Sequence, residues 1–356
     1  MQQPDDGFHE RHEKFVRANR VIFLGAGFSA EAGIPMTGPL LAQTMSMFAR
    51  ECPGIFSRVE GYARDAFSAP ETAASSLDFS RLSFADLCTF LEYIELKEYG
   101  GGERWSDSGS REKLAFRFYL AKTILTRTPT KETIPEIYRE FAKRLRPSDV
   151  VVTFNWDCLL ETALEAVGKE FCYPSLSDDS DDREHKLCIY KLHGSVNWRF
   201  KLPRREQTLD WTGMGFTTGM MRDDVYVSMQ ARNQAAWKDH SPLGEIEPLL
   251  VLPGAGKAFD VRVLAPLWYK PENAFGYTHD VYIIGLSLSL DDFFIRSFFL
   301  ANLPNIEAFS GIEGRRIRII NPDPAVRTNY AFLLGQPNVE FLCEPLGPLH
   351  LAMFDS

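Results

Sequence analysis

The sequence predicts an α/β protein with a Rossmann-like, doubly wound parallel sheet and a mainly helical insertion that forms a small domain. One observation is a set of short β-rich runs, each ending at a polar or glycine-containing break. Several are apolar throughout instead of alternating, which is typical of strands buried on both faces of a sheet. The runs are residues 21–24, 150–154, 187–192, 249–252, 281–285, 317–320 and 339–342.

The second observation is the helical patterning between these runs, for example at residues 157–167 and 291–303. Repetition of strand, loop and helix favours a doubly wound sheet. We expect one domain over residues 1–356, with a core made of 15–35 and 149–356 and a helical insertion at 36–148. The segment 84–99 carries the clearest helical pattern of that insertion, whereas residues 195–247 show no clear period.

Composition and charge argue against a nucleic-acid-binding, a membrane-spanning and a secreted protein. The formal net charge of −9 argues against a nucleic-acid-binding surface, and no run of 18 apolar residues exists to span a membrane. Residues 1–20 are too polar for a signal peptide and predict a solvated helix, and 175–186 predict an acidic surface loop. The six cysteines form no C-x-x-C pair. We therefore expect reduced thiols in a cytoplasmic protein.

The third observation is the glycine turn that follows the first apolar run. The stretch from Gly25 to Ala30 reads G-x-G-x-x-A, with Ala26 between the glycines and Ser29 before the final alanine. In such turns the first glycine permits the tight bend, and the second, here Gly27, lets the backbone approach a pyrophosphate. The pattern predicts a dinucleotide site, and the alternative is a plain tight turn.

Two departures disfavour an ordinary dehydrogenase. No acidic residue lies about 20 positions further on to bind the ribose. Gly33, Ile34 and Pro35 also interrupt any long helix that starts at Phe28. The loop is therefore expected to continue over the nucleotide.

Other strand ends carry polar residues at the edge where α/β proteins bind ligands. Taken singly, each has an ordinary structural explanation, and Asn155 alone would be read as a helix cap. Their joint order along the chain is harder to explain in that way. They are Asn155 and Asp157, then His193, Gly194 and Ser195, then Gly285 and Ser287, and finally Asn321.

These motifs together resemble the sirtuin (Sir2-like) superfamily. The resemblance rests on "GAGFSAEAGIP", "TFNWD", "LHGS", "IIGLSLS" and "IIN" in that order, from residue 25 to residue 321. It implies a single SIR2-like domain with NAD as substrate. The turn with Gly25, Ala26, Gly27 and Ser29 would hold the pyrophosphate, and Ile34 and Pro35 would cover the nicotinamide ribose.

The resemblance also implies the catalytic residues. Asn155 would contact the ribose and the attacking water, Asp157 would hold the carboxamide, and His193 would be the base. The adenosine side would be lined by Gly285, Ser287 and Asn321. Cleavage of the nicotinamide–ribose bond needs a fixed sugar, a polarised water and stabilised cation character, but no metal.

Two differences from protein-deacylating sirtuins indicate another activity. Residues 195–247 contain no cysteine, so the structural zinc ribbon is absent, and Met36–Pro39 replaces the Phe-Arg pair that follows the GIP loop. The chain is more similar to divergent effectors of bacterial anti-phage defence that deplete NAD. The analogy implies a homo-oligomer and a separate HerA-like ATPase partner.

The sequence therefore predicts an NAD⁺ glycohydrolase. The alternatives are an NAD-dependent deacylase and a non-catalytic module that binds NAD or ADP-ribose. The presence of both Asn155 and His193 favours catalysis, because binding alone would not need the pair.

Overall fold

The structure is a computed structural model, and its described residues leave several gaps. The helix expected before residue 20 and most of the acidic loop lie outside them. The described residues are 20–67, 77–96, 110–174, 185–201, 225–227, 246–254, 257, 264, 267–268, 271, 278–289, 292–302, 315–334 and 338–355.

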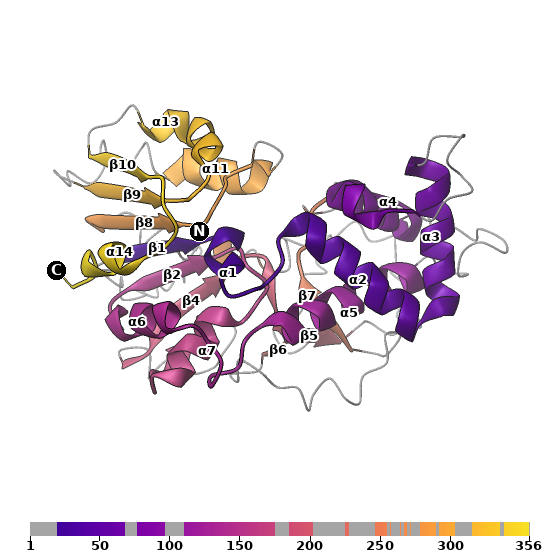
Figure 1. The fold of residues 1–356 in the computed structure, drawn as a ribbon, viewed down its shortest axis with the longest axis horizontal. Coiled ribbons are helices and arrows are strands. Elements are labelled where there is room, and N and C mark those ends of the chain that lie inside the picture. The colour runs from indigo at the N-terminus through magenta and orange to yellow at the C-terminus, as the bar shows by residue number, and fades with distance from the viewer. Residues whose placement is uncertain are drawn as a thin grey trace, which may run out of the picture.

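Seven strands form one parallel sheet in the order β10-β9-β8-β1-β2-β4-β3. The winding proceeds from β1 toward β2 and β4, and later resumes on the other side of β1 with β8, β9 and β10 (Figure 1). This confirms the predicted Rossmann-like, doubly wound class. The strands are β1 (Arg20–Leu24), β2 (Val150–Thr153), β3 (Phe171–Cys172), β4 (Leu187–Lys191), β8 (Asp280–Ile284), β9 (Arg316–Ile320) and β10 (Val339–Leu342).

A second, three-stranded sheet has the order β6-β5-β7 and is antiparallel. The apolar run at 249–252 belongs here, in β7, and not in the parallel sheet. Its side chains alternate between two cores, because Leu249 and Val251 lie in the core of the parallel sheet, whereas Leu250 and Leu252 lie in that of the helical insertion. An apolar run alone does not distinguish this arrangement from a strand of the parallel sheet. The strands are β5 (Gly194–Lys201), β6 (Val225–Val227) and β7 (Ile246–Leu250).

The helices separate into two groups (Figure 1). Helices α2 to α5 lie to one side of the parallel sheet and form a second apolar core with residues of β5 and β7. Helix α6 lies in the interval predicted as insertion but packs with α7 and α14 at the parallel sheet. The helices are α1 (Ala26–Ala30), α2 (Thr37–Glu51), α3 (Pro53–Phe67), η2 (Phe79–Arg81), α4 (Phe84–Leu96), α5 (Ser110–Arg127), α6 (Glu136–Arg144), α7 (Leu159–Ala166), α11 (Phe293–Asn302), η6 (Pro324–Tyr330), α13 (Ala331–Leu334) and α14 (Pro348–Ala352).

Both faces of the parallel sheet are covered. On one face, Phe23 of β1 packs on Phe299 of α11 with ring centroids 4.8 Å apart. On the other, Tyr282 of β8 stacks on Phe354 at 4.2 Å, just after α14. All five residues of β1 are buried, and the four that follow Arg20 form the uninterrupted apolar run that predicts a central strand.

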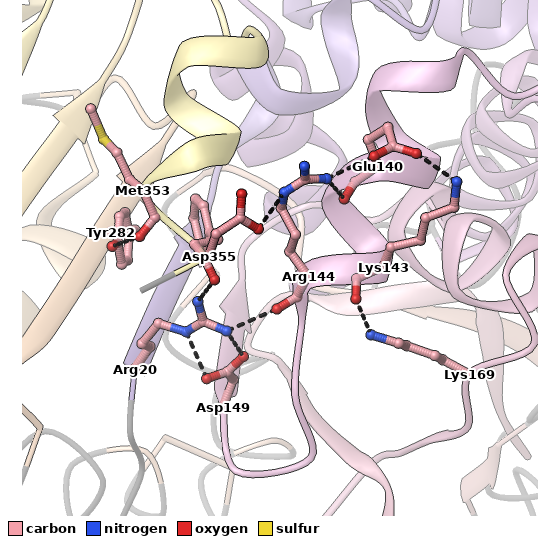
Figure 2. Close-up of polar contacts among 10 residues, drawn as sticks. Arg20, Glu140, Lys143, Arg144, Asp149, Lys169, Tyr282, Met353 and Asp355 are labelled. Atoms are coloured by element: carbon pink, nitrogen blue, oxygen red, sulfur yellow. Dashed lines mark hydrogen bonds and ion pairs between the residues drawn. The ribbon is translucent and has the colours of Figure 1, made fainter.

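The amino ends of the central strands are joined by a buried ion pair (Figure 2). Arg20 donates to both carboxylate oxygens of Asp149, at 2.9 and 2.6 Å, and both side chains are 5% exposed or less. The same guanidinium donates to the carbonyls of Arg144 and Phe354. It therefore ties β1 and the residue before β2 to α6 and to the segment after α14.

Candidate active site

The candidate site lies at the carboxyl ends of β1 and β8, where the winding of the sheet reverses. Doubly wound sheets bind ligands at this kind of switch point. Each strand runs directly into a glycine turn, and the two turns bond to each other. The Gly25 amide donates to the Ile284 carbonyl at 3.0 Å, and the Gly27 amide donates to the Gly285 carbonyl at 2.8 Å.

The glycines are required by the closeness of these two turns. A Cβ on Gly27 would lie 2.9 Å from the Gly285 Cα and carbonyl oxygen. Gly285 has a φ of +63°, and a Cβ there would overlap the backbone of Gly27 and Phe28. The sequence assigned Gly27 to backbone approach toward a pyrophosphate. The structure gives it another reason, which is contact with the neighbouring strand end.

The predicted interruption after the glycine turn is confirmed. Helix α1 spans only five residues, and Gly33 follows it with a φ of +84°. Ile34 is buried and Pro35 is half-buried, and the chain then enters α2. The loop from Gly33 to Pro35 thus links the glycine turn to the helical insertion.

Asn155 lies across from the glycine turn, beyond the end of β2. Its amide nitrogen donates to the Gly25 carbonyl at 2.9 Å and contacts the Ser29 hydroxyl at 3.1 Å. Its Oδ1 has no hydrogen-bond partner among the residues that the structure describes. Asn155 is therefore fixed by its nitrogen and presents an oxygen that can accept from a ligand hydroxyl or a water.

The helix cap that Asn155 alone would suggest belongs to Asp157. The Asp157 carboxylate accepts from the Leu159 amide at 2.9 Å at the start of α7. Burial raises the pKa of Asp157, while the Lys191 ammonium, the Leu159 amide and the Ser29 hydroxyl act in the opposite direction. Asp157 is thus 8% exposed and already engaged by the protein, so its fit to a ligand carboxamide stays a prediction.

His193 follows β4 in a nearly closed environment. The residue is 7% exposed, and its ring lies against Phe154 and Trp268, with centroids 5.3 and 6.1 Å away. Its Nε2 has no hydrogen-bond partner among the described residues. Burial lowers the pKa of His193 well below its usual range, the Lys257 charge lowers it further, and a contact with the Phe154 backbone partly offsets this.

The backbone of His193 is held from two sides. Its carbonyl accepts from the Val251 amide at 2.8 Å, and the preceding residue, Leu192, donates to the Thr153 carbonyl. Gly194 has a φ of +76°, and a Cβ there would overlap the Leu249 carbonyl. The histidine therefore lies where the parallel sheet passes into the antiparallel one.

The three residues predicted to line the adenosine side lie in different surroundings. Gly285 is buried in the paired turns, and Ser287 is exposed. The Asn321 side chain instead binds protein, because its Nδ2 donates to the Leu286 carbonyl at 3.2 Å and its Oδ1 accepts from the Asp323 amide. Asn321 shapes the turn before Ser287, and direct contact of its amide with a ligand stays a prediction.

A buried polar network behind Asp157 was missed at the level of sequence. The Lys191 ammonium pairs with Glu161 at 2.9 Å, both 1% exposed, and also donates to the Asp157 carbonyl. Tyr173 donates to the same Glu161 carboxylate at 3.0 Å. The signal that could have found this network is the lysine inside the otherwise apolar run "LCIYKL".

The fold and these residues define the class, a doubly wound α/β protein with a glycine turn, a strand-end asparagine and a buried histidine at the carboxyl edge of the sheet. Residues 149–230 match the family model described as the SIR2-like domain. The match confirms the resemblance to the Sir2-like superfamily and supports an NAD-related function of the sirtuin type. Membership of the anti-phage branch stays a prediction.

Solved structures similar to this chain include three Sir2 proteins. One, a Sir2 enzyme described for mechanism and regulation, has 14% identity and a TM-score of 0.39, with 96% of this chain and 93% of that chain covered. A sirtuin described for substrate affinity has 13% identity and a TM-score of 0.44, with 94% and 92% covered. A mutant Sir2 homologue in complex with ADP-ribose has 14% identity and a TM-score of 0.37, with 96% and 92% covered. A search of curated proteins gave no match.

Neither a metal centre nor a membrane span is found in the described part of the chain. No group of three or more His, Cys, Asp or Glu side chains there could hold a metal ion. None of the helices described is both long and apolar enough to cross a bilayer.

Proposed function

We propose that this chain hydrolyses the nicotinamide–ribose bond of NAD⁺ and releases nicotinamide and ADP-ribose. The observation that carries the proposal is the Nε2 atom of His193, which is buried and has no partner among the described residues. A buried polar atom without a partner costs about 1–3 kcal/mol, so a ligand that bonds to it recovers that cost. The low pKa of His193 keeps this nitrogen an acceptor at neutral pH.

The proposed reaction breaks one bond and forms one. The C1′–N bond breaks with its electron pair going to the pyridinium nitrogen, so nicotinamide leaves as a neutral molecule. The water oxygen forms the new bond to C1′, and the water proton passes through His193 to solvent. A positioned general base typically contributes about 10²–10⁴-fold to the rate of such a step.

In this scheme Asn155 orients the ribose or the attacking water. Its Nδ2 is held by Gly25, so its free Oδ1 is fixed with respect to the glycine turn. An acceptor at this position can align a ribose hydroxyl or the attacking water, which is a proximity effect. Asp157 would hold the carboxamide of the leaving group.

The paired glycine turns would hold the remaining part of NAD⁺. Ala26 and Ser287 are both exposed next to the contact of Gly27 with Gly285, and a dinucleotide binds at this edge in doubly wound folds. The exposed Ser287 hydroxyl has no partner among the described residues and fits a role on the adenosine side.

Incubation of purified protein with NAD⁺ tests this function. The proposal expects nicotinamide and ADP-ribose in equal amounts without an acylated peptide, measured by chromatography. Nicotinamide release only with an acylated lysine peptide, together with acyl-ADP-ribose, would indicate a deacylase. Binding of NAD⁺ without turnover in all activation states would indicate a binding module.

The biological setting we propose is NAD depletion during bacterial anti-phage defence, within the cytoplasm. It follows from the similarity to effectors of that kind, and it includes a homo-oligomer and a separate HerA-like ATPase. The hydrolysis assay should therefore be repeated with such an ATPase present, because these effectors are commonly silent without a partner.

A further inference from the structure

Lys191 is a buried cation at the candidate active site that the proposed reaction does not use. It is the last residue of β4, two residues before His193, and it is 1% exposed. Its ammonium donates to the Asp157 carbonyl, in the loop between β2 and α7, and pairs with Glu161 of α7 at 2.9 Å. Lys191 therefore joins the end of β4, which leads to His193, to the loop that carries Asn155.

The Lys191 ammonium is itself held by buried groups. The Glu161 oxygen that pairs with it also accepts from the Tyr173 hydroxyl at 3.0 Å. The Asn197 amide nitrogen donates to that hydroxyl at 3.1 Å, so the chain of contacts extends to β5. All four residues are buried. Because little water competes for these groups, the ammonium has a fixed position with respect to α7 and β5.

Other hydrogen bonds join the same two segments of the chain. The Trp156 carbonyl accepts from the Val196 amide at 2.9 Å and from the Ser195 hydroxyl at 3.3 Å. The next carbonyl along the loop, that of Asp157, accepts from Lys191. A hydrogen bond from a charged donor is roughly twice as strong as one between neutral groups. The Lys191 contact is therefore expected to hold the loop most firmly.

We propose that Lys191 is a positioning residue: its ammonium holds the Asp157 carbonyl and thereby fixes the loop that carries Asn155 against the strand end that leads to the buried histidine. The inference rests on the proposed function, because it assigns Lys191 to the same site. Lys191 acts through the backbone of Asp157 and does not touch the ligand. A misplacement of about 1 Å at a reacting group can lower a rate by about 100-fold, so a contact of this kind can control turnover.

The test separates positioning from stability by removing both charges of the buried pair. Lys191→Met with Glu161→Gln leaves no unpaired charge in the interior, and neutral replacements of buried ion pairs are often tolerated. The glutamine side chain can still accept from Tyr173, whereas methionine cannot donate to the Asp157 carbonyl. The double variant therefore removes the hydrogen bond to the loop without leaving a buried charge.

We expect the folded double variant to release nicotinamide from NAD⁺ with a kcat lowered by about 10–100-fold. Its KM should stay within about threefold of the wild-type value, because the loss falls on the geometry of the reacting groups and not on the glycine turns. Urea unfolding, measured on the same samples, shows that the loss of kcat does not come from unfolded protein. A wild-type kcat in the folded double variant would overturn the proposal.

The matched control is Arg20→Met with Asp149→Asn, which removes a buried ion pair at the amino ends of the strands, on the opposite edge of the sheet. It should lower the free energy of unfolding and leave kcat unchanged. An equal loss of kcat in this control would also overturn the proposal. If the Lys191 and Glu161 double variant does not fold, Lys191→Leu with Glu161→Gln takes its place, with the same criteria.

A second measurement does not depend on turnover. Hydrogen exchange followed by mass spectrometry reports the opening of the Leu159 and Val196 amides, which both bind the loop. In the double variant, exchange at these amides should accelerate at least about tenfold more than exchange in β1. Equal acceleration in all three places would indicate only a general loss of stability and would contradict the positioning role. If the wild type releases no nicotinamide in any activation state, the proposed function fails, and hydrogen exchange alone decides the role of Lys191.

Discussion

Asn155 and His193 each leave one hydrogen-bonding atom without a partner in the described structure, although both side chains are held by other contacts. Asn155 is held through its nitrogen, and His193 by aromatic packing on one side. Fixed side chains with one open acceptor each are suited to binding hydroxyl groups or water. At the residue scale, these two acceptors define the candidate site.

The first prediction concerns these two residues. Asn155→Ala and His193→Ala should each lower the rate of nicotinamide release by about 10²–10⁴-fold. The melting temperature is measured beside the rate, because Asn155 also donates to the Gly25 carbonyl and the His193 ring packs on Phe154 and Trp268. Wild-type rates in two folded variants would show that the active-site assignment is wrong.

The second prediction concerns pH and stability. The pKa of His193 is lowered in the folded state, so below about pH 6.5 the unfolded chain takes up a proton that the folded protein does not. Stability from this group is complete above that pH and is lost as the pH falls toward the folded pKa. His193→Gln should therefore lose less melting temperature than the wild type between pH 7.5 and pH 5.5. An equal loss in both proteins would contradict the pKa direction.

At the scale of elements, the two glycine turns explain how the ends of β1 and β8 come together at the candidate site. The ends of β1 and β8 can approach this closely because both lack side chains at Gly27 and Gly285. The pairing of β1 with β8 through five residues in register brings the turns level with each other. The position of the site therefore depends on the register between β1 and β8 as well as on the glycine motif.

Gly285→Ala is expected to be strongly destabilising. The new methyl group would overlap the backbone of Phe28 and would also require a positive φ. Gly33→Ala is the matched control, since Gly33 has a φ of +84° but a methyl group there would meet no atom within 4 Å. The control should cost only about 1–2 kcal/mol. Urea unfolding measures both, and equal losses would contradict the predicted overlap.

The Lys191–Glu161 pair links β4 to α7 and gives a fourth prediction. Lys191→Met leaves the Glu161 carboxylate buried without its cation, which typically costs about 3–5 kcal/mol. Lys191→Met combined with Glu161→Gln removes both charges and should recover part of that loss in urea unfolding. A double variant no more stable than Lys191→Met would show that charge burial is not the cause.

The sequence predicted most strands of the parallel sheet because buried strands read as apolar runs. It also placed residues 249–252 in the parallel sheet, although β7 belongs to the antiparallel sheet. A local apolar run does not specify which strands will become its neighbours. The glycine turn, Asn155 and His193 were found from motif order. Trp268 was missed, because it meets His193 only through the tertiary fold.

At the scale of the whole molecule, the predicted homo-oligomer requires an exposed surface on which two copies of the chain can pack. The aromatic-rich helix α11 mostly packs inward, with Phe298 and Phe299 buried, as one core would require. Phe293 and Leu300 remain 74% and 44% exposed and lie seven residues apart, on one side of the helix.

The fifth prediction is that Phe293→Ser lowers the mass of the assembly measured by light scattering. The serine removes apolar area from the exposed side of α11, and Leu349→Ser, at a residue 77% exposed on α14, is the control. A monomeric wild type at every concentration, alone and with the ATPase, would refute the oligomer itself. An unchanged mass in Phe293→Ser would exclude α11 as the contact.

The position of β1 at the centre of the sheet has a consequence for synthesis on the ribosome. Val21 pairs with Val150 on one side and with Val281 on the other. Because the chain is synthesised from its amino end, the apolar residues 21–24 of this strand have no paired neighbours until β2, and on the other side β8, have been translated. The turn at Gly285, which bonds to the turn at Gly27, is made still later, so a nascent chain of half the length lacks one of the two turns. In a growing polypeptide the two glycine turns therefore cannot bond to each other until the carboxyl half of the sheet has been made.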